Sequence, residues 1–136
     1  MNGNAVTPAK VLLFGLDGAL SMELRHALGA EAKVVWSGPA SSVPDCLHVI
    51  RRESPELVFC GSDRRCVVTV LEAVRQVTPR LPVVVASPYP EVGQWLDAIE
   101  AGAADYCAAP FEISQIQWII RNSVQSARYG AIPFAF

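Results

Sequence analysis

Residues 101–111 read Ala-Gly-Ala-Ala-Asp-Tyr-Cys-Ala-Ala-Pro-Phe. Gly102 follows a helical segment and is a suitable stop, because glycine readily adopts the left-handed conformation that ends helices. Residues 105–108 then form a short apolar segment that we interpret as a strand. The stretch therefore predicts the end of a helix followed by the last strand of a sheet.

Four further apolar segments precede this one, at residues 11–14, 34–36, 57–60 and 83–86. They are continuous apolar runs, as expected of parallel strands that are buried on both faces. Segments with helical periodicity separate them. The alternation predicts an α/β domain in which helices cover both faces of a parallel sheet.

Each helical segment has an apolar stripe. The first spans residues 21–28, with Ser21 as a plausible cap, and the second begins near Ser42. In the fifth helix Trp118 projects nearly opposite the stripe, which makes it a candidate contact residue. The stripes of the later helices consist of Val67, Val70, Leu71 and Val74 in the third, Val92, Leu96 and Ile99 in the fourth, and Ile113, Ile116, Ile120, Val124 and Ala127 in the fifth.

Composition excludes several classes of function. The chain has 136 residues, 51% of them apolar and 18% charged, which suits one compact domain. Its apolar runs are far shorter than the roughly 20 residues of a membrane span, and no signal peptide is evident, so we expect a cytoplasmic protein that does not bind membranes. The net charge is −2 and the basic pairs are isolated, so we expect no nucleic acid partner.

The sequence shows no pattern for a metal or a cofactor. The cysteines at positions 46, 60, 66 and 107 lack the Cys-x-x-Cys spacing, and His26 and His48 have no paired carboxylate or cysteine. We interpret the cysteines as small buried apolar residues. No cofactor is expected.

Three motifs resemble the receiver domain of response regulators. Residues 55–61, Pro-Glu-Leu-Val-Phe-Cys-Gly, are similar to the segment that leads to the phospho-accepting Asp, and residues 82–87, Pro-Val-Val-Val-Ala-Ser, to the strand that ends in Thr or Ser. Residues 101–111 resemble the strongest signature, Ala-Gly-Ala-x-Asp-Tyr-x-x-Lys-Pro-Phe. The resemblance implies a single doubly wound (βα)5 flavodoxin-like domain with a five-stranded parallel sheet in the order 2-1-3-4-5.

The same motifs lack most of the phosphorylation chemistry. Gly61 stands at the phospho-acceptor position, Gly15 and Leu16 at the acidic pair that holds Mg²⁺, and Ala109 at the lysine. Ser87 alone remains of these functional positions, with Pro110 after it in the chain at the proline that the family often has in the cis form. A lone hydroxyl cannot neutralise a phosphoryl group, so the resemblance implies a degenerate, non-enzymatic pocket without metal or catalytic residues.

Two alternatives for this pocket remain open. Asp17 or Asp63 could support residual phosphorylation from an offset position, although both suit helix capping. The vacated crevice could instead hold a small uncharged ligand. Residues 13–20 also resemble the opening motif of haloacid-dehalogenase phosphatases, but Gly15 replaces the nucleophile of that motif.

The remaining hypothesis is a protein-interaction module. Its candidate contact residues are Trp95, Tyr106 and Trp118, because aromatic side chains dominate interface energetics. We expect a signalling protein as partner, or a homodimer through the fourth helix, fifth strand and fifth helix. We divide the chain into an extension (residues 1–9), the receiver-like domain (10–128) and a tail (129–136).

Overall fold

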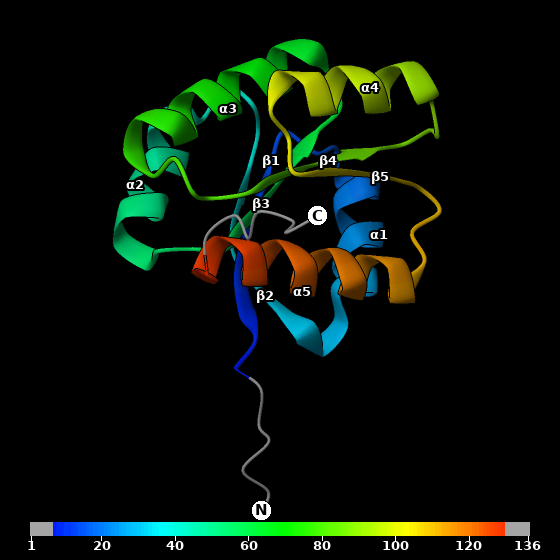
Figure 1. Cartoon of the computed structure of the whole chain (residues 1–136), viewed down its shortest axis with the longest axis horizontal. Coiled ribbons are helices and arrows are strands. Elements are labelled where there is room, and N and C mark those ends of the chain that lie inside the picture. The colour runs from blue at the N-terminus through cyan, green and yellow to red at the C-terminus, as the bar shows by residue number, and fades with distance from the viewer. Residues whose placement is uncertain (1–6, 130–136) are drawn as a thin grey trace, which may run out of the picture.

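The computed structural model describes residues 7–129, with side chains described up to residue 125. Five strands alternate with five α-helices, and a short 3-10 helix (Gly29–Glu31) follows the first helix (Figure 1). In chain order the elements are β1 (Ala9–Phe14), α1 (Gly18–Leu28), β2 (Ala32–Gly38), α2 (Val43–Glu53), β3 (Leu57–Gly61), α3 (Arg64–Val77), β4 (Val83–Ser87), α4 (Val92–Ala101), β5 (Asp105–Ala108) and α5 (Ile113–Tyr129).

The strands form one sheet in the order β2-β1-β3-β4-β5, and every neighbouring pair is parallel. This confirms the predicted fold class and strand order. Because the chain reverses direction of winding at β1, the carboxyl ends of β1 and β3 lie side by side, where α/β proteins place their functional sites. Phe14 pairs with Cys60 at that edge.

Alternate residues of the strands enter two separate cores. Leu12 and Phe14 face α2, α3 and α4, whereas Val11 and Leu13 face α1 and α5. Figure 1 shows α3 and α4 on one side of the sheet and α5 on the other. Since both faces are covered, the central strands are apolar throughout, which explains the continuous runs in the sequence.

The start of α1 differs from the prediction. The helix begins at Gly18 with Asp17 as its N-cap, and Ser21 lies inside the helix and is buried. Asp17 Oδ1 accepts a hydrogen bond of 2.8 Å from the backbone N–H of Leu20. A carboxylate at this position satisfies a free helix N–H and favours the positive end of the helix dipole, so the helix starts there.

Helix α4 faces the opposite way from the prediction. Val92, Leu96 and Ile99 do lie on one stripe, but all three are exposed, and Ala98 is the buried residue of the helix. The helix turns its small side toward β4 and β5. The predicted helix is therefore confirmed, whereas the prediction that the face with Val92, Leu96 and Ile99 is buried is wrong.

The other helices agree with their predicted stripes. All four predicted residues of α3 are buried, and Ile116, Ile120 and Val124 of α5 are buried, whereas Ile113 at its start is exposed. Ala127 lies outside the described side chains.

All four cysteines are free and buried, which confirms their interpretation as small core residues. Within residues 7–129, no helix has the length and apolar character that crossing a membrane requires.

Candidate functional site

The end of β1 is shaped by Gly15, which has a φ of +72°. Its N–H donates to the carbonyl of Gly38 at 2.8 Å. A Cβ added at Gly15 would lie 2.5 Å from Cys66 Sγ, closer than side chains pack. A left-handed backbone and a sulfur atom in contact both favour glycine here, so an acidic residue at this position requires a different loop.

The end of β3 is closed by the backbone of Gly15, the residue that follows β1. Gly61 is buried, and a Cβ added to it would lie 2.5 Å from the carbonyl oxygen of Gly15 and 3.8 Å from Cys66 Sγ. The Gly15 backbone is fixed by its hydrogen bond to Gly38 and cannot move aside as the end of a flexible side chain can. The space in front of Gly61 is therefore occupied by protein atoms.

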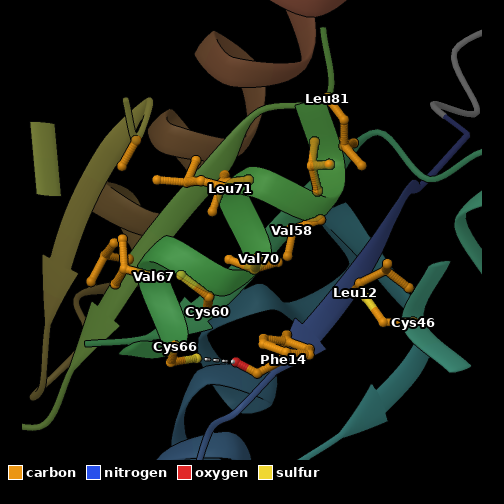
Figure 2. Packing of buried hydrophobic residues seen from close by; sticks show 14 of the residues in the cluster. Leu12, Phe14, Cys46, Val58, Cys60, Cys66, Val67, Val70, Leu71 and Leu81 are labelled. Atoms are coloured by element: carbon orange, nitrogen blue, oxygen red, sulfur yellow. Dashed lines mark hydrogen bonds between the residues drawn. The ribbon is translucent and has the colours of Figure 1, made fainter. Parts of the chain in front are cut away.

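Cys66, the third residue of α3, covers this closed space. Figure 2 shows it beside Phe14 and Cys60, with a hydrogen bond from its thiol to the Phe14 carbonyl oxygen at 3.7 Å. A hydrogen bond from Cys60 lowers the pKa of Cys66 below its ordinary value, and the same bond raises the pKa of Cys60. The Cys66 thiol is thus bonded to the Phe14 carbonyl oxygen and lies beside a second buried thiol.

Asp17 and Asp63 flank the closed space at the starts of two helices. The Asp17 carboxylate caps α1, as described above. Asp63 occupies the N-cap position of α3 but its side chain makes no capping hydrogen bond. Both residues are exposed. The prediction that both residues cap helices is therefore confirmed for Asp17. Asp63 has the predicted N-cap position, but its side chain forms no capping hydrogen bond.

Ser87 lies at the end of β4 and is completely buried. Its Oγ is 2.8 Å from the Tyr89 carbonyl oxygen and 2.9 Å from Gln94 Oε1, and it accepts from the Tyr89 N–H at 3.2 Å. A hydroxyl group has one hydrogen, so the Tyr89 carbonyl oxygen and Gln94 Oε1 are alternative acceptors for the single Ser87 donor. That donor is therefore engaged within the protein and is not free for a phosphoryl group.

Tyr106 of β5 joins the same network. Its hydroxyl is 3.0 Å from the Tyr89 carbonyl oxygen and 3.3 Å from Gln94 Oε1, and it accepts from the Glu91 N–H at 3.4 Å. Gln94 therefore bridges Ser87 and Tyr106. The ring is half-buried against the α3 side of the sheet. The sequence singled out Ser87 and Tyr106 but gave no signal for Gln94, whose role depends on the turn between β4 and α4.

The remaining pocket residues lie at the rim. Ala109 is half-buried and donates its N–H to the Ser87 carbonyl oxygen at 2.9 Å. The Ala109–Pro110 bond is cis, as the sequence had suggested. Leu16 packs against the core on the α1 side. The structure thus gathers Gly15, Gly61 and Ser87 at one edge, with Cys66 as a member that sequence reasoning missed.

The residues present do not fit Mg²⁺. This ion requires several oxygen ligands, usually carboxylates, in a near-octahedral arrangement. Gly15, Leu16 and Gly61 offer no side-chain oxygen. Across the described part of the chain, no three His, Cys, Asp or Glu side chains lie close enough together to hold a metal ion.

The candidate contact residues are divided between the two faces of the domain. Trp95 of α4 is 45% exposed and Trp118 of α5 is 58% exposed, but their helices cover opposite faces of the sheet. Tyr106 lies on the edge strand between them. The structure therefore groups Trp95 with its own helix: Val92, Leu96 and Ile99 complete an exposed apolar surface, which we call the α4 stripe.

Comparison with known proteins gives a consistent family. No family model matches the chain. It is 36% identical over 112 residues to the response regulator protein FleR of Pseudomonas aeruginosa, an alignment that covers 76% of this chain and 22% of FleR. A response regulator from Thermotoga maritima superposes with a TM-score of 0.72 at 22% identity, covering 89% of this chain and 100% of the other.

The structure of NtrX from Brucella abortus gives a TM-score of 0.71 at 21% identity, covering 90% of this chain and 28% of NtrX. The similarity to FleR in sequence, together with the strand order, decides the assignment. The chain belongs to the receiver-domain family of response regulators. The receiver spans about a fifth of the length of FleR.

Proposed function

We propose that this receiver is a non-phosphorylatable module that acts in two-component signalling through protein contacts. The observation that carries the proposal is the closed acceptor position: a side chain at Gly61 would collide with the Gly15 carbonyl oxygen at 2.5 Å. The chain thus lacks both the phospho-accepting side chain at position 61 and the space for it. If only the side chain had been lost, a cavity would be expected in front of Gly61.

The two alternatives for the pocket have less support. Residual phosphorylation needs a free carboxylate beside a cation, but Asp17 is engaged with the Leu20 N–H and the metal ligands are absent. A small ligand needs open volume in the crevice, but Cys66 Sγ and the Gly15 backbone occupy the space next to Gly61. The hydroxyl donor of Ser87 is also engaged with acceptors of Tyr89 and Gln94.

Phosphorylation is tested with acetyl phosphate and Mg²⁺, followed by intact mass. We expect no added phosphoryl group and no change in the amide spectrum with beryllofluoride, under conditions in which an active receiver domain reacts. A mass increase of one phosphoryl group that Asp63→Asn abolishes would refute the proposal. Asp17→Asn serves as the matching test of the other carboxylate.

The interaction half of the proposal rests on the α4 stripe. Exposed apolar surface on one helix face costs solubility unless a partner covers it. The four side chains of the stripe carry no charge, so two copies can bury them against each other without desolvating a charged group. We therefore propose a second copy of the chain as the occupant, because a twofold interface requires a patch that complements itself.

Sedimentation of the purified chain tests this interface. We expect a dimer that Leu96→Glu converts to a monomer, since a carboxylate in the apolar contact would be desolvated without a partner. Met22→Glu is the matched control, because Met22 of α1 is 73% exposed and lies outside the stripe. A monomer in the wild-type protein, or equal effects of the two substitutions, would show that the stripe does not mediate self-association.

A further inference from the structure

A groove lies between α3 and α4. These two helices cover the side of the sheet opposite α5 (Figure 1). The volume of the groove is about 470 Å³. Val67, Val85 and Ala98 form an apolar floor that is buried in the protein, and the half-buried Ala101 lines one wall. The groove is distinct from the α4 stripe, because its residues lie on the side of α4 that faces α3.

The rim of the groove is acidic. Asp63, Asp97 and Glu100 line it and are exposed, against Arg64 as the only basic residue of its lining. None of the three carboxylates makes an ion pair or a side-chain hydrogen bond with the described residues. The rim therefore has an excess of negative charge that the described residues leave unpaired.

Helix α4 adds to this imbalance. It contains no Lys or Arg, and Glu100 lies in its last turn, where the helix dipole is negative. Arg75 of α3 approaches this end, but its Nη2 donates to the Ala101 carbonyl oxygen at 2.8 Å and makes no ion pair with either α4 carboxylate. Asp97 and Glu100 are therefore left without an ion-pair partner among the described residues, although Arg75 contacts the helix end beside them.

We propose that the α3–α4 groove binds a basic, amphipathic segment of a partner protein. An apolar side chain of the segment would contact the floor, and its Lys or Arg side chains would reach Asp97 and Glu100. A segment is favoured over a small organic cation because the carboxylates are exposed: each solvated pair contributes little, so several must form at once. Helical segments that bind grooves present apolar anchors in this way.

A defined peptide tests the groove. The probe is a synthetic helix of about 14 residues with Leu at i, i+3, i+4 and i+7 and Lys elsewhere, together with a counterpart that has Glu in place of Lys. Amide spectra of the labelled chain report the site. We expect the Lys peptide to shift residues 62–68 and 94–101, with an affinity that falls as salt is raised, and the Glu peptide to bind at least about tenfold more weakly.

Charge reversal gives the sharper test. Asp97→Lys should lower the affinity for the Lys peptide by about tenfold and raise the affinity for the Glu peptide. Glu23→Lys on α1 should change both affinities by less than about twofold. Both positions are exposed, so the substitutions preserve the fold. The proposal is overturned if the shifts map to the α4 stripe or to α1, if neither peptide binds, if both variants respond equally, or if free arginine amide binds as tightly as the peptide.

Discussion

At the scale of single residues, Gly61 and Gly15 determine what the strand ends can do. The carbonyl oxygen of Gly15 fills the space that a Gly61 side chain would need, and the Cys66 sulfur fills the space beside Gly15. These contacts join residues about 50 positions apart in the chain. Glycine at both positions was evident from the sequence, but the closure depends on the +72° φ of Gly15 and on the sulfur position, which no motif encodes.

Substitution of Gly61 tests this closure. We expect Gly61→Ala to lower the free energy of unfolding by roughly 1–3 kcal/mol, because the added methyl group overpacks a buried site against backbone. Gly61→Asp should be destabilised further and still accept no phosphoryl group. Urea denaturation and intact mass measure the two effects.

Gly93→Ala provides the control for the Gly61 variants. Gly93 lies in α4 and an added Cβ would meet nothing within 4 Å. Alanine is favoured over glycine by up to about 1 kcal/mol in a helix interior and by less in the first turn, where Gly93 lies, so this variant should be at least as stable as the wild type. If Gly61→Ala is as stable as Gly93→Ala, the strand end is more open than described above.

Cys107 gives a pH dependence of stability. Burial, followed by the nearby Asp105 charge, raises the pKa of Cys107 from 9.0 to about 12. Between these values the folded state keeps the thiol proton that the unfolded state releases, so stability is full below pH 9 and falls as pH rises toward 12. A difference of one bound proton changes the free energy of unfolding by about 1.4 kcal/mol per pH unit.

The measurement is urea denaturation from pH 8 to pH 11 in a reducing buffer. Cys107→Ala should be less stable at pH 8, because it leaves a small cavity, but its stability should decline less steeply with pH. The difference in slope isolates Cys107 from the other groups that titrate in this range. Parallel slopes for the two proteins would mean that the thiol is ionised as easily in the folded state as in the unfolded state.

At the scale of elements, α4 shows where sequence patterns stop being informative. Its apolar residues recur with the correct helical period, and the period alone cannot say which face is buried. The sheet selects the face with Ala98, because small residues let α4 approach β4 and β5 closely. In α3 the same reasoning succeeded because its stripe of large apolar residues is the side that packs on the sheet.

The turn that leads into α4 is fixed by the Ser87, Gln94 and Tyr106 network. Tyr106→Phe removes the hydroxyl that bonds to Tyr89 and Glu91, so we expect a loss of about 1 kcal/mol of unfolding free energy. Exchange of the amide hydrogens of residue 89 and of residues 91–94 should become faster. Tyr89→Phe is the matched control: Tyr89 is 66% exposed and contributes backbone atoms to the network, so removing its hydroxyl should change neither measurement. Equal effects of the two variants would assign the order of the turn to something other than this network.

At the scale of the whole molecule, the polarity pattern along the chain predicted a sheet that is covered on both faces, whereas the strand order was predicted from the resemblance to receiver domains. The continuous apolar strands require covering on both faces, and parallel connections place α1 and α5 on one side and the other helices on the opposite side. Burial is nevertheless uneven among the helices. Five residues of α3 are buried, whereas Ala98 is the single buried residue of α4.

This uneven burial predicts that α4 opens without the rest of the domain. Amides of α3 and β3 should exchange through global unfolding, and those of α4 through a local opening of lower free energy. Leu13→Ala discriminates between the two. Leu13 is completely buried in the core between the sheet and α1 and α5, so the variant should lose about 2–5 kcal/mol of unfolding free energy.

In the Leu13→Ala variant, exchange of α3 and β3 amides should accelerate more than about tenfold, and α4 amides should change by less than about twofold. The reason is that Leu13 contributes to global stability and makes no contribution to the local opening of α4. If α4 amides accelerate as much as those of α3, α4 unfolds only with the whole domain. Its exposed stripe would then be part of a rigid surface, and binding there would involve no cost of ordering the helix.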